Sequence, residues 1–255
     1  MYTARNVDLT KLNSLTKYPS IPTYHTIDKG ILGDVAVRFD GPILLTEKID
    51  GTNARIILLA NGDYILGSRE ELLYAKGDLI GNPQLGIVEH LRPIADELRV
   101  TYDGVIVIYG ELFGGKIGAA SKNYTSDQSV GFRVFDIQEL NSAKMSVMLE
   151  LPTKNIAVWR DNGGQLFLNE DHLDRFIGEH YELLSLAPRL MKIDALPTSL
   201  EDSHMLLRDV IHSTGVALDN DANGSAEGIV ARSLNRTQIA KLRFEDYAKT
   251  LRKKK

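Results

Sequence analysis

In the stretch Thr46-Glu47-Lys48-Ile49-Asp50-Gly51-Thr52-Asn53-Ala54-Arg55, a lysine stands where an apolar run gives way to a turn that contains glycine. The flanking runs 42–45 and 56–59 are apolar, which predicts two buried strands with Lys48 at the edge of their core. An amine attacks only when it is neutral, and burial or nearby cations favour the neutral form. This position therefore suits a nucleophile. The alternative is a surface lysine beside an Asp-Gly turn.

Further short motifs follow this stretch in a fixed order. They are Gly-Ser-Arg-Glu at 67–70, Tyr-Gly-Glu-Leu-Phe-Gly at 109–114, Phe-Arg-Val-Phe-Asp-Ile at 132–137, Glu-Gly-Ile-Val-Ala-Arg at 227–232, and Ile-Ala-Lys-Leu-Arg at 239–243. As an ordered set they resemble the six motifs of the covalent nucleotidyltransferases, the superfamily of polynucleotide ligases and messenger-RNA capping enzymes. Glu-Lys-x-x-Gly-Thr-Asn is most similar to the RNA ligase 2-type and RNA-editing ligases.

The resemblance extends from residue 40 to residue 245 and implies a fold. We expect an α+β protein with two largely antiparallel β-sheets and flanking helices, as in the ATP-grasp-like nucleotidyltransferase domain of ligases. The expected organisation is a single domain over 1–255, with an irregular lead-in at 1–41 and a basic C-terminal tail at 246–255. Because the sequence ends soon after the last motif, we expect no OB-fold and no helical C-terminal domain.

Charge, cysteine content and the length of apolar stretches limit the classes of protein to which this chain can belong. The formal charge of −4 and the pI near 5.9 do not indicate a strongly basic nucleic-acid-binding protein, although one basic face is enough to bind RNA. The chain has no cysteine, which excludes disulfides and thiolate metal sites. It also lacks an apolar stretch of membrane-spanning length, so we expect a cytoplasmic protein with no membrane partner.

Local patterns predict the remaining elements. Asn61-Gly62 is a strong hairpin signal between strands at 54–60 and 64–68. We also expect a helix at 83–100 opened by Pro83, a hairpin around 159–165, helices at 172–186 and 199–213, and strands at 105–109, 132–137, 227–231 and 238–243.

The resemblance implies three nucleotidyl transfers that start at Lys48. The lysine attacks the α-phosphorus of ATP and becomes lysyl-AMP. The AMP then passes to the 5'-phosphate of an RNA end or nicked duplex, and a 3'-hydroxyl finally displaces AMP. The expected role is RNA repair, and full sealing is expected to use a partner protein or a C-terminal module.

The final strand carries two cations on one face. Alternation along 238–243 places Ile239, Lys241 and Arg243 together, a spacing suited to gripping a phosphate. The alternative is a basic edge that faces solvent. In the superfamily, these cations stabilise charge on the reacting phosphorus.

Two glutamates at strand ends are the expected ligands of ribose and of a divalent cation. Glu111 follows the apolar run 105–109, and Glu227 opens the next motif. Magnesium prefers oxygen ligands and keeps several waters, so Mg²⁺ with Mn²⁺ as a substitute is the expected metal, bound directly or through water.

The resemblance gives four further residues a role in binding ATP or AMP. An aromatic before the motif aspartate stacks on the purine, which is Phe135 here, with Phe132 as the second choice; a core aromatic is the alternative for each. Asn53 acts on the adenylate or the 3' end, and Glu47 lies near the adenine. Arg69 contacts the phosphates or the RNA 5' end, or else pairs with Glu70 or Glu71.

Two positions in the first motif are secondary candidates, Asp50 and Arg55. Many RNA ligases of this type carry His where this chain has Asp50, whereas DNA ligases and capping enzymes carry Asp. A minimal ATP-dependent DNA ligase and a GTP-using capping guanylyltransferase therefore stay open as alternatives. A non-catalytic nucleic-acid-binding module that has kept the fold is the alternative outside the enzymes.

Overall fold

The chain divides into two compact units, each drawn from three segments of the sequence. The computed structural model describes residues 2–76, 78–81, 86–222 and 224–253. The first unit comprises Met1–Pro19, Thr52–Leu112 and Phe132–Ser185. The second comprises Ser20–Gly51, Phe113–Gly131 and Leu186–Lys255. That the two units act as a single nucleotidyltransferase domain stays a prediction.

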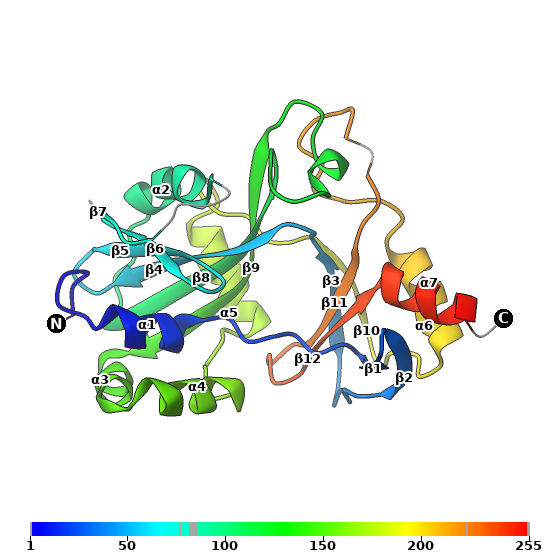
Figure 1. The fold of residues 1–255 in the computed structure, drawn as a ribbon, viewed down its shortest axis with the longest axis horizontal. Coiled ribbons are helices and arrows are strands. Elements are labelled where there is room, and N and C mark those ends of the chain that lie inside the picture. The colour runs from blue at the N-terminus through cyan, green and yellow to red at the C-terminus, as the bar shows by residue number, and fades with distance from the viewer. Residues whose placement is uncertain (1, 77, 82–85, 223, 254–255) are drawn as a thin grey trace. The chain divides into compact units, whose positions relative to one another are not determined.

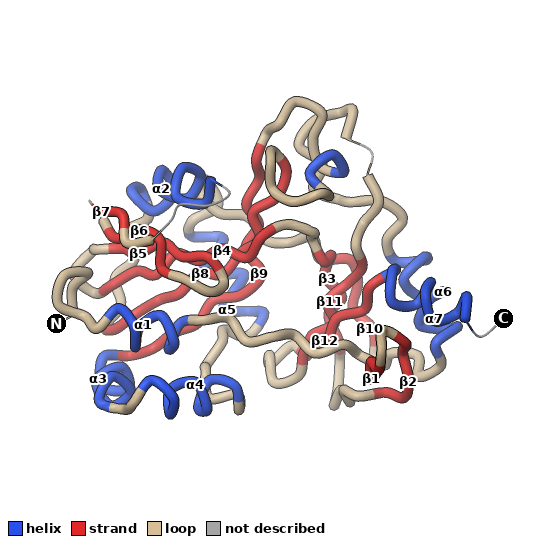
Figure 2. Tube along the Cα trace, viewed as in Figure 1, coloured by secondary structure: helices blue, strands red, loops and turns tan. Residues whose placement is uncertain are grey.

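The first unit is built on a six-stranded sheet in the order β7-β6-β5-β4-β8-β9, coloured red in Figure 2. The strands are β4 (Thr52–Leu59), β5 (Tyr64–Ser68), β6 (Leu72–Ala75), β7 (Asp78–Leu79), β8 (Gly104–Gly114) and β9 (Val130–Asn141). The apolar run at 105–109 is fully buried within β8, as predicted. The Asn61-Gly62 hairpin is also confirmed, because β4 and β5 pair antiparallel and Gly62 has a φ of +83°.

Five helices accompany this sheet: α1 (Leu9–Thr16), α2 (Ile87–Glu97), α3 (Ser142–Glu150), α4 (Thr153–Asp161) and α5 (Glu170–Glu179). Helix α1 packs against α4, as Figure 1 shows. Asp8 caps its N-terminus, because the Asp8 side chain accepts a hydrogen bond of 3.0 Å from the Lys11 amide. Its buried face includes Leu12 and Leu15, neither of which is exposed.

The expected irregular lead-in at 1–41 was wrong. This segment contains α1 and an antiparallel pair formed by β1 (His25–Asp28) and β2 (Ile31–Val35). The leucines of α1 recur every three residues after a capping aspartate, which is a helical signal. The sequence analysis did not predict this helix, because it is only eight residues long and the residues around it are polar.

Several other predicted elements differ from the structure. In each case a glycine or a polar run is compatible with more than one kind of element. The hairpin around 159–165 was wrong, because α4 runs through Trp159 and ends at Asp161. Asn162 caps this helix, and Gly163 follows with a φ of +78°. An Asn-Gly pair terminates a helix as readily as it turns a hairpin. Helix α5 ends at Glu179, earlier than expected, and α3 was not predicted. Pro83, the expected start of α2, lies outside the described residues.

The second unit is built on a four-stranded antiparallel sheet in the order β10-β3-β11-β12. Its strands are β10 (Arg189–Ile193), β3 (Ile43–Lys48), β11 (Gly228–Ser233) and β12 (Ile239–Arg243). Two helices, α6 (Leu200–Val210) and α7 (Phe244–Lys253), lie side by side in this unit (Figure 1). Ser199 caps α6, and its hydroxyl accepts a hydrogen bond from the Asp202 amide at 3.0 Å.

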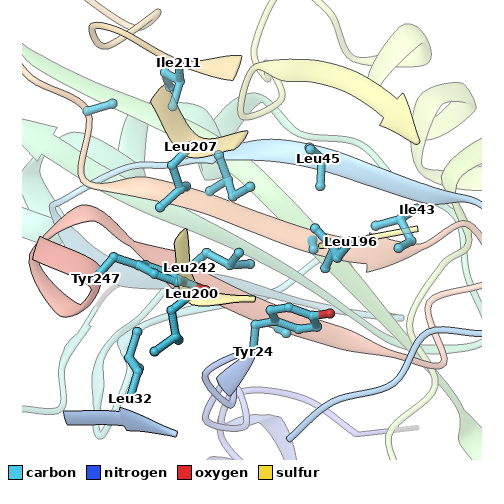
Figure 3. Packing of buried hydrophobic residues seen from close by; sticks show 14 residues of the cluster. Tyr24, Leu32, Ile43, Leu45, Leu196, Leu200, Leu207, Ile211, Leu242 and Tyr247 are labelled. Carbon is cyan, nitrogen blue, oxygen red and sulfur yellow. The ribbon is translucent and has the colours of Figure 1, made fainter. Parts of the chain in front are cut away.

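One face of this sheet forms the core of the second unit, as Figure 3 shows. Leu45 of β3 and Leu242 of β12 pack in the same cluster as Leu207 of α6 and Tyr247 of α7. Because strand side chains alternate, the next residues along each strand point to the opposite face. The candidate cations of the sequence analysis occupy that opposite face.

The segment 246–255, expected to be a basic tail, is helical up to Lys253, and its basic residues Arg252 and Lys253 lie in the last turn of that helix. Residues up to Lys253 form α7, in which Tyr247 and Thr250 are buried, while Lys254 and Lys255 lie outside the described residues. Because the other faces of α7 carry many charges, the short apolar stripe was easy to miss. The α+β class with antiparallel sheets is confirmed, and the described residues form no closed barrel. Within the same residues, none of the helices has both the length and the apolar character needed to cross a bilayer.

Leu12→Ala tests whether α1 is part of the packed structure. The substitution leaves a cavity where a fully buried side chain stood, so we expect a loss of about 2–5 kcal/mol in the free energy of unfolding, measured by urea denaturation. Thr10→Ala, on the exposed side of the same helix, is the control. An unchanged urea midpoint for Leu12→Ala would show that α1 does not pack as described.

Candidate functional site

Three strands of the second unit bring the first and last motifs into one row. Lys48, the last residue of β3, stands opposite Gly228 of β11, and Gly228 stands opposite Arg243 of β12. Two residues earlier along β12, Lys241 stands opposite Val230. The predicted alternation of the final strand is confirmed, because Ala240 and Leu242 are buried in the core while Lys241 and Arg243 are partly exposed.

The Lys48 amine is partly buried and has a carboxylate partner. Its Nζ donates to Glu227 Oε2 over 2.5 Å, and the two side chains are 24% and 19% exposed. Burial is the larger influence on Glu227 and raises its pKa, whereas the Lys48 charge acts in the opposite direction. The amine therefore does not point into bulk solvent. Its direct partner, however, is an anion rather than one of the expected cations.

Positive charges also gather near this ion pair. The pKa of Lys241 is lowered, first by burial and then by the charges of Arg243 and Lys48. Such an effect needs short separations, because charges more than about 10 Å apart are largely screened in salt. The structure thus brings together Lys48, Glu227, Lys241 and Arg243, which lie up to 195 positions apart in the sequence.

Arg243 has a carboxylate partner that the sequence analysis did not identify. Asp246, in the first turn of α7, accepts two hydrogen bonds from the guanidinium, 2.8 Å from Nε and 2.9 Å from Nη2. Asp246 is buried, and its bond and charge raise the pKa of Arg243. The Arg-x-x-Asp spacing was the only available signal, and it is common at the start of helices.

Glu47 is held by a segment in which the sequence showed no motif. Its side chain is 2% exposed and accepts hydrogen bonds from Thr214 Oγ1 at 2.6 Å and from the Gly215 amide at 2.9 Å. Burial raises the pKa of Glu47 despite these bonds, which favour the ionised form. The Glu47 amide donates to the Pro188 carbonyl at 2.9 Å, so the residue before Lys48 is fixed on both sides.

Asp50 lies in the turn that follows Lys48. Its amide donates to the hydroxyl of the buried Tyr124 over 2.6 Å, and its charge contributes to the raised pKa of Glu227. The described residues contain no group of three or more His, Cys, Asp or Glu able to hold a metal ion by themselves. The carboxylates of Asp50 and Glu227 nevertheless fit a magnesium ion, because magnesium typically binds one or two carboxylates together with phosphate and water.

Two candidate residues of the first unit lie side by side on neighbouring strands of its sheet. Asn53 of β4 is in register with Glu111 of β8, and both are partly exposed. Nothing in the sequence spacing, 58 positions, predicted this pairing. It follows from the antiparallel register of two long strands, in which directly opposed residues share a face.

The two candidate aromatics of β9 both contact other groups of the first unit. Phe135 meets Tyr18 edge-on with ring centroids 5.0 Å apart. Phe132 covers Gly110, where an added Cβ atom would lie 2.4 Å from its ring. Both rings remain partly exposed, so the choice between base stacking and core packing stays open for each.

The two candidate arginines of the first unit have protein partners. Arg55 is fully buried and donates to the backbone and side chain of Asn13, and burial lowers its pKa to about 10. Arg69 forms an ion pair with Glu70 at 3.7 Å, which was the alternative to phosphate binding. The position of Arg55 indicates a structural role.

A cavity of about 870 Å³ lies elsewhere in the second unit. Tyr24, Ile43, Leu196 and Leu200, all labelled in Figure 3, contribute to its lining. Ile43 is the first residue of β3 and Lys48 the last, and none of the predicted site residues lines this cavity. Cavity volume alone would therefore not locate the lysine.

A family model and several solved structures match this chain. A family model described as RNA ligase matches residues 41–249. No curated protein matches the sequence. Among solved structures, Naegleria gruberi RNA ligase with PPi has a TM-score of 0.55 and 12% identity, covering 92% of this chain and 62% of that chain. A variant of that ligase with AMP and Mn also gives 0.55 and 12%, covering 90% and 61%.

A third solved structure, a variant of the same ligase with ATP and Mn, gives a TM-score of 0.54 and 12% identity, covering 90% of this chain and 61% of that chain. At this identity the similarity establishes the fold alone. The chain spans less than two thirds of the length of these Naegleria proteins.

Glu47→Gln tests the burial of the Glu47 carboxylate through pH. Because burial raises this pKa, the folded protein keeps a proton that the unfolded chain has already released just above the ordinary value of 4.5. Stability therefore falls as pH rises through that window. We expect the urea midpoint of Glu47→Gln, relative to the unmodified protein, to increase over the same window.

The matched control is Glu245→Gln, which removes an exposed carboxylate from the same unit. If the midpoint of Glu47→Gln keeps a constant difference from that of the unmodified protein at every pH, the carboxylate is not buried as described.

Proposed function

This chain belongs to the RNA ligase family, and on that premise we propose that it is an ATP-dependent RNA ligase that joins 5'-phosphate and 3'-hydroxyl ends through lysyl-AMP formed on Lys48. The observation that carries the proposal is the row formed by Lys48, Gly228 and Arg243 across three strands, with Glu227 bonded to the amine and Lys241 on the same face. A partly buried amine among cations suits nucleophilic catalysis.

In the first step, the neutral Nζ of Lys48 attacks the α-phosphorus of ATP. A nitrogen–phosphorus bond forms, the bond from the α-phosphorus to the bridging oxygen breaks, and pyrophosphate leaves with that electron pair. A 5'-phosphate oxygen of RNA then attacks the same phosphorus and displaces the lysine. Finally a 3'-hydroxyl attacks the RNA phosphate, AMP leaves, and a phosphodiester forms.

The ion pair between Lys48 and Glu227 must break before the first step. Pairing with a carboxylate favours the ammonium form of a lysine, which cannot attack. The amine must therefore separate from Glu227 and lose a proton as the nucleotide binds. Lys241 and Arg243 support this change, because positive neighbours favour the neutral amine and stabilise the negative charge that develops at phosphorus.

ATP and a divalent cation are the proposed cofactors. Structures of Naegleria gruberi RNA ligase variants with ATP and Mn support this choice. Glu227 and Asp50 are the carboxylates of the second unit that would hold Mg²⁺ or Mn²⁺, and Glu111 is the candidate in the first unit. When bound, the ion would neutralise phosphate charge.

The other nucleotide contacts are proposed from the family resemblance. Glu111 and Asn53, which lie in register, bind the ribose or the adenylate, and Phe135 stacks on the purine. Stacking contributes about 1–3 kcal/mol for any base, so hydrogen bonds must distinguish adenine from guanine. Glu47, fixed beside Lys48, is the proposed contact near the base.

Lys48→Ala tests the nucleophile. We expect no transfer of label from [α-³²P]ATP to the protein, measured by denaturing electrophoresis, because the nitrogen–phosphorus bond cannot form. Lys192→Ala, which removes an exposed lysine of β10, is the matched control and should label normally. Persistent labelling of Lys48→Ala would overturn the assignment.

The choice of nucleotide and polynucleotide is tested with the unmodified protein. We expect labelling with ATP rather than GTP, and sealing of nicked duplexes that carry AMP on the 5' end and RNA on the 3'-hydroxyl side. Labelling with GTP alone would indicate a capping guanylyltransferase, and sealing of DNA nicks alone a DNA ligase. No adduct with either nucleotide, in Mg²⁺ or Mn²⁺, would indicate a non-catalytic binding module.

A further inference from the structure

Asp246 holds the guanidinium of Arg243 by one edge. The carboxylate bonds Nε and Nη2 at 2.8 and 2.9 Å, a two-bond arrangement that fixes the plane of the guanidinium as well as its position. Asp246 is 7% exposed, so it has little freedom to move. The pair joins the last residue of β12 to the first turn of α7.

Helix stabilisation does not explain this geometry. An acidic side chain in the first turn of a helix interacts favourably with the helix dipole, but that interaction needs charge and not two directed bonds. Glu245 already places an exposed carboxylate in the same turn. The bidentate bond to Arg243 therefore has a separate consequence, which is the direction in which the guanidinium points.

The Arg243 side chain leaves the sheet on the face that carries Lys48. Arg243 is in register with Gly228, which in turn is in register with Lys48. A Cβ atom at Gly228 would lie 2.1 Å from the Leu242 carbonyl oxygen, so no side chain fits between the two cations in this row. The Asp246 bonds use Nε and Nη2, which leaves Nη1 to approach a phosphate beside Lys48.

Charge alone does not require Asp246. A guanidinium stays protonated at neutral pH with or without a carboxylate partner. Removing Asp246 would therefore leave the positive charge of Arg243 in place and change where its donors point. It would also remove a negative charge that raises the pKa of Lys241, and Asp246→Glu keeps that charge.

We propose that Asp246 is a positioning residue that directs Arg243 toward the phosphate transferred by Lys48. This inference rests on the proposed function. It concerns a residue outside the motifs that the sequence analysis identified, and it gives α7 a part in the chemistry as well as in the fold.

A double-mutant comparison tests the proposal. The single-turnover rate of protein labelling by [α-³²P]ATP is measured for the unmodified protein, Asp246→Asn, Arg243→Lys and the double variant. Misplacement of a reacting group by about 1 Å costs up to about 100-fold in rate, and we expect a loss of about 10-fold or more for Asp246→Asn. The double variant should be no slower than Arg243→Lys, because a lysine has no fork for the carboxylate to direct.

Two controls separate positioning from folding. Glu245→Gln removes an acid from the same turn and should label at the unmodified rate. The urea midpoint is measured for every variant. Asp246→Glu keeps the charge but moves the carboxylate by one methylene, and it should also slow labelling, which covers the case in which Asp246→Asn does not fold.

Each outcome decides the proposal. An unchanged rate for a folded Asp246→Asn or Asp246→Glu overturns it, as does an equal further loss when Asp246→Asn is added to Arg243→Lys. In both cases the unmodified protein still labels, so the proposed function stands. Failure of the unmodified protein to label overturns the proposed function and this inference with it.

Discussion

The antiparallel pairing of β11 with both β3 and β12 is the constraint on which the candidate site depends. It places Gly228 between Lys48 and Arg243 and brings Glu227 against an amine that is 179 positions away in the sequence. The alternate residues of these strands point to the other face of the sheet, where they form part of the core of the second unit. A slip of one residue in β12 would move Lys241 and Arg243 from the outer face to the core face.

Each carboxylate that is buried near Lys48 has a hydrogen-bonding partner. Glu47 and Asp246 are buried with two hydrogen bonds each, and Glu227 is paired with Lys48. Burial of an unpartnered carboxylate would cost far more than these bonds contribute. The pair between Lys48 and Glu227 likewise gives each of these partly buried charges a partner. In the mechanism that we propose, nucleotide binding replaces this pair before the amine reacts.

The candidate residues are distributed over both units. The second unit holds the proposed nucleophile, both cations of the last motif and the residues that fix them. The first holds Asn53, Glu111 and the aromatics of β9, which the family resemblance connects with the nucleotide. In the first unit the structure also shows that a charged motif residue can be structural, because Arg55 is wholly buried against Asn13.

The sequence by itself determined the strands that carry the motifs, the alternation that puts Lys241 and Arg243 on one face, and the family, because period-two patterns and ordered motifs are local properties of a chain. It failed at α1, α4 and α7, where short helices have few apolar residues or end in signals shared with turns. Only the tertiary structure decided the partners of the site: Thr214 for Glu47, Glu227 for Lys48 and Asp246 for Arg243. The first two contacts join residues more than 160 positions apart and depend on burial and register, which no local pattern encodes. Arg243 and Asp246 are close in sequence, and their contact depends on the start of α7 directly after the end of β12, a helix that the sequence analysis did not predict.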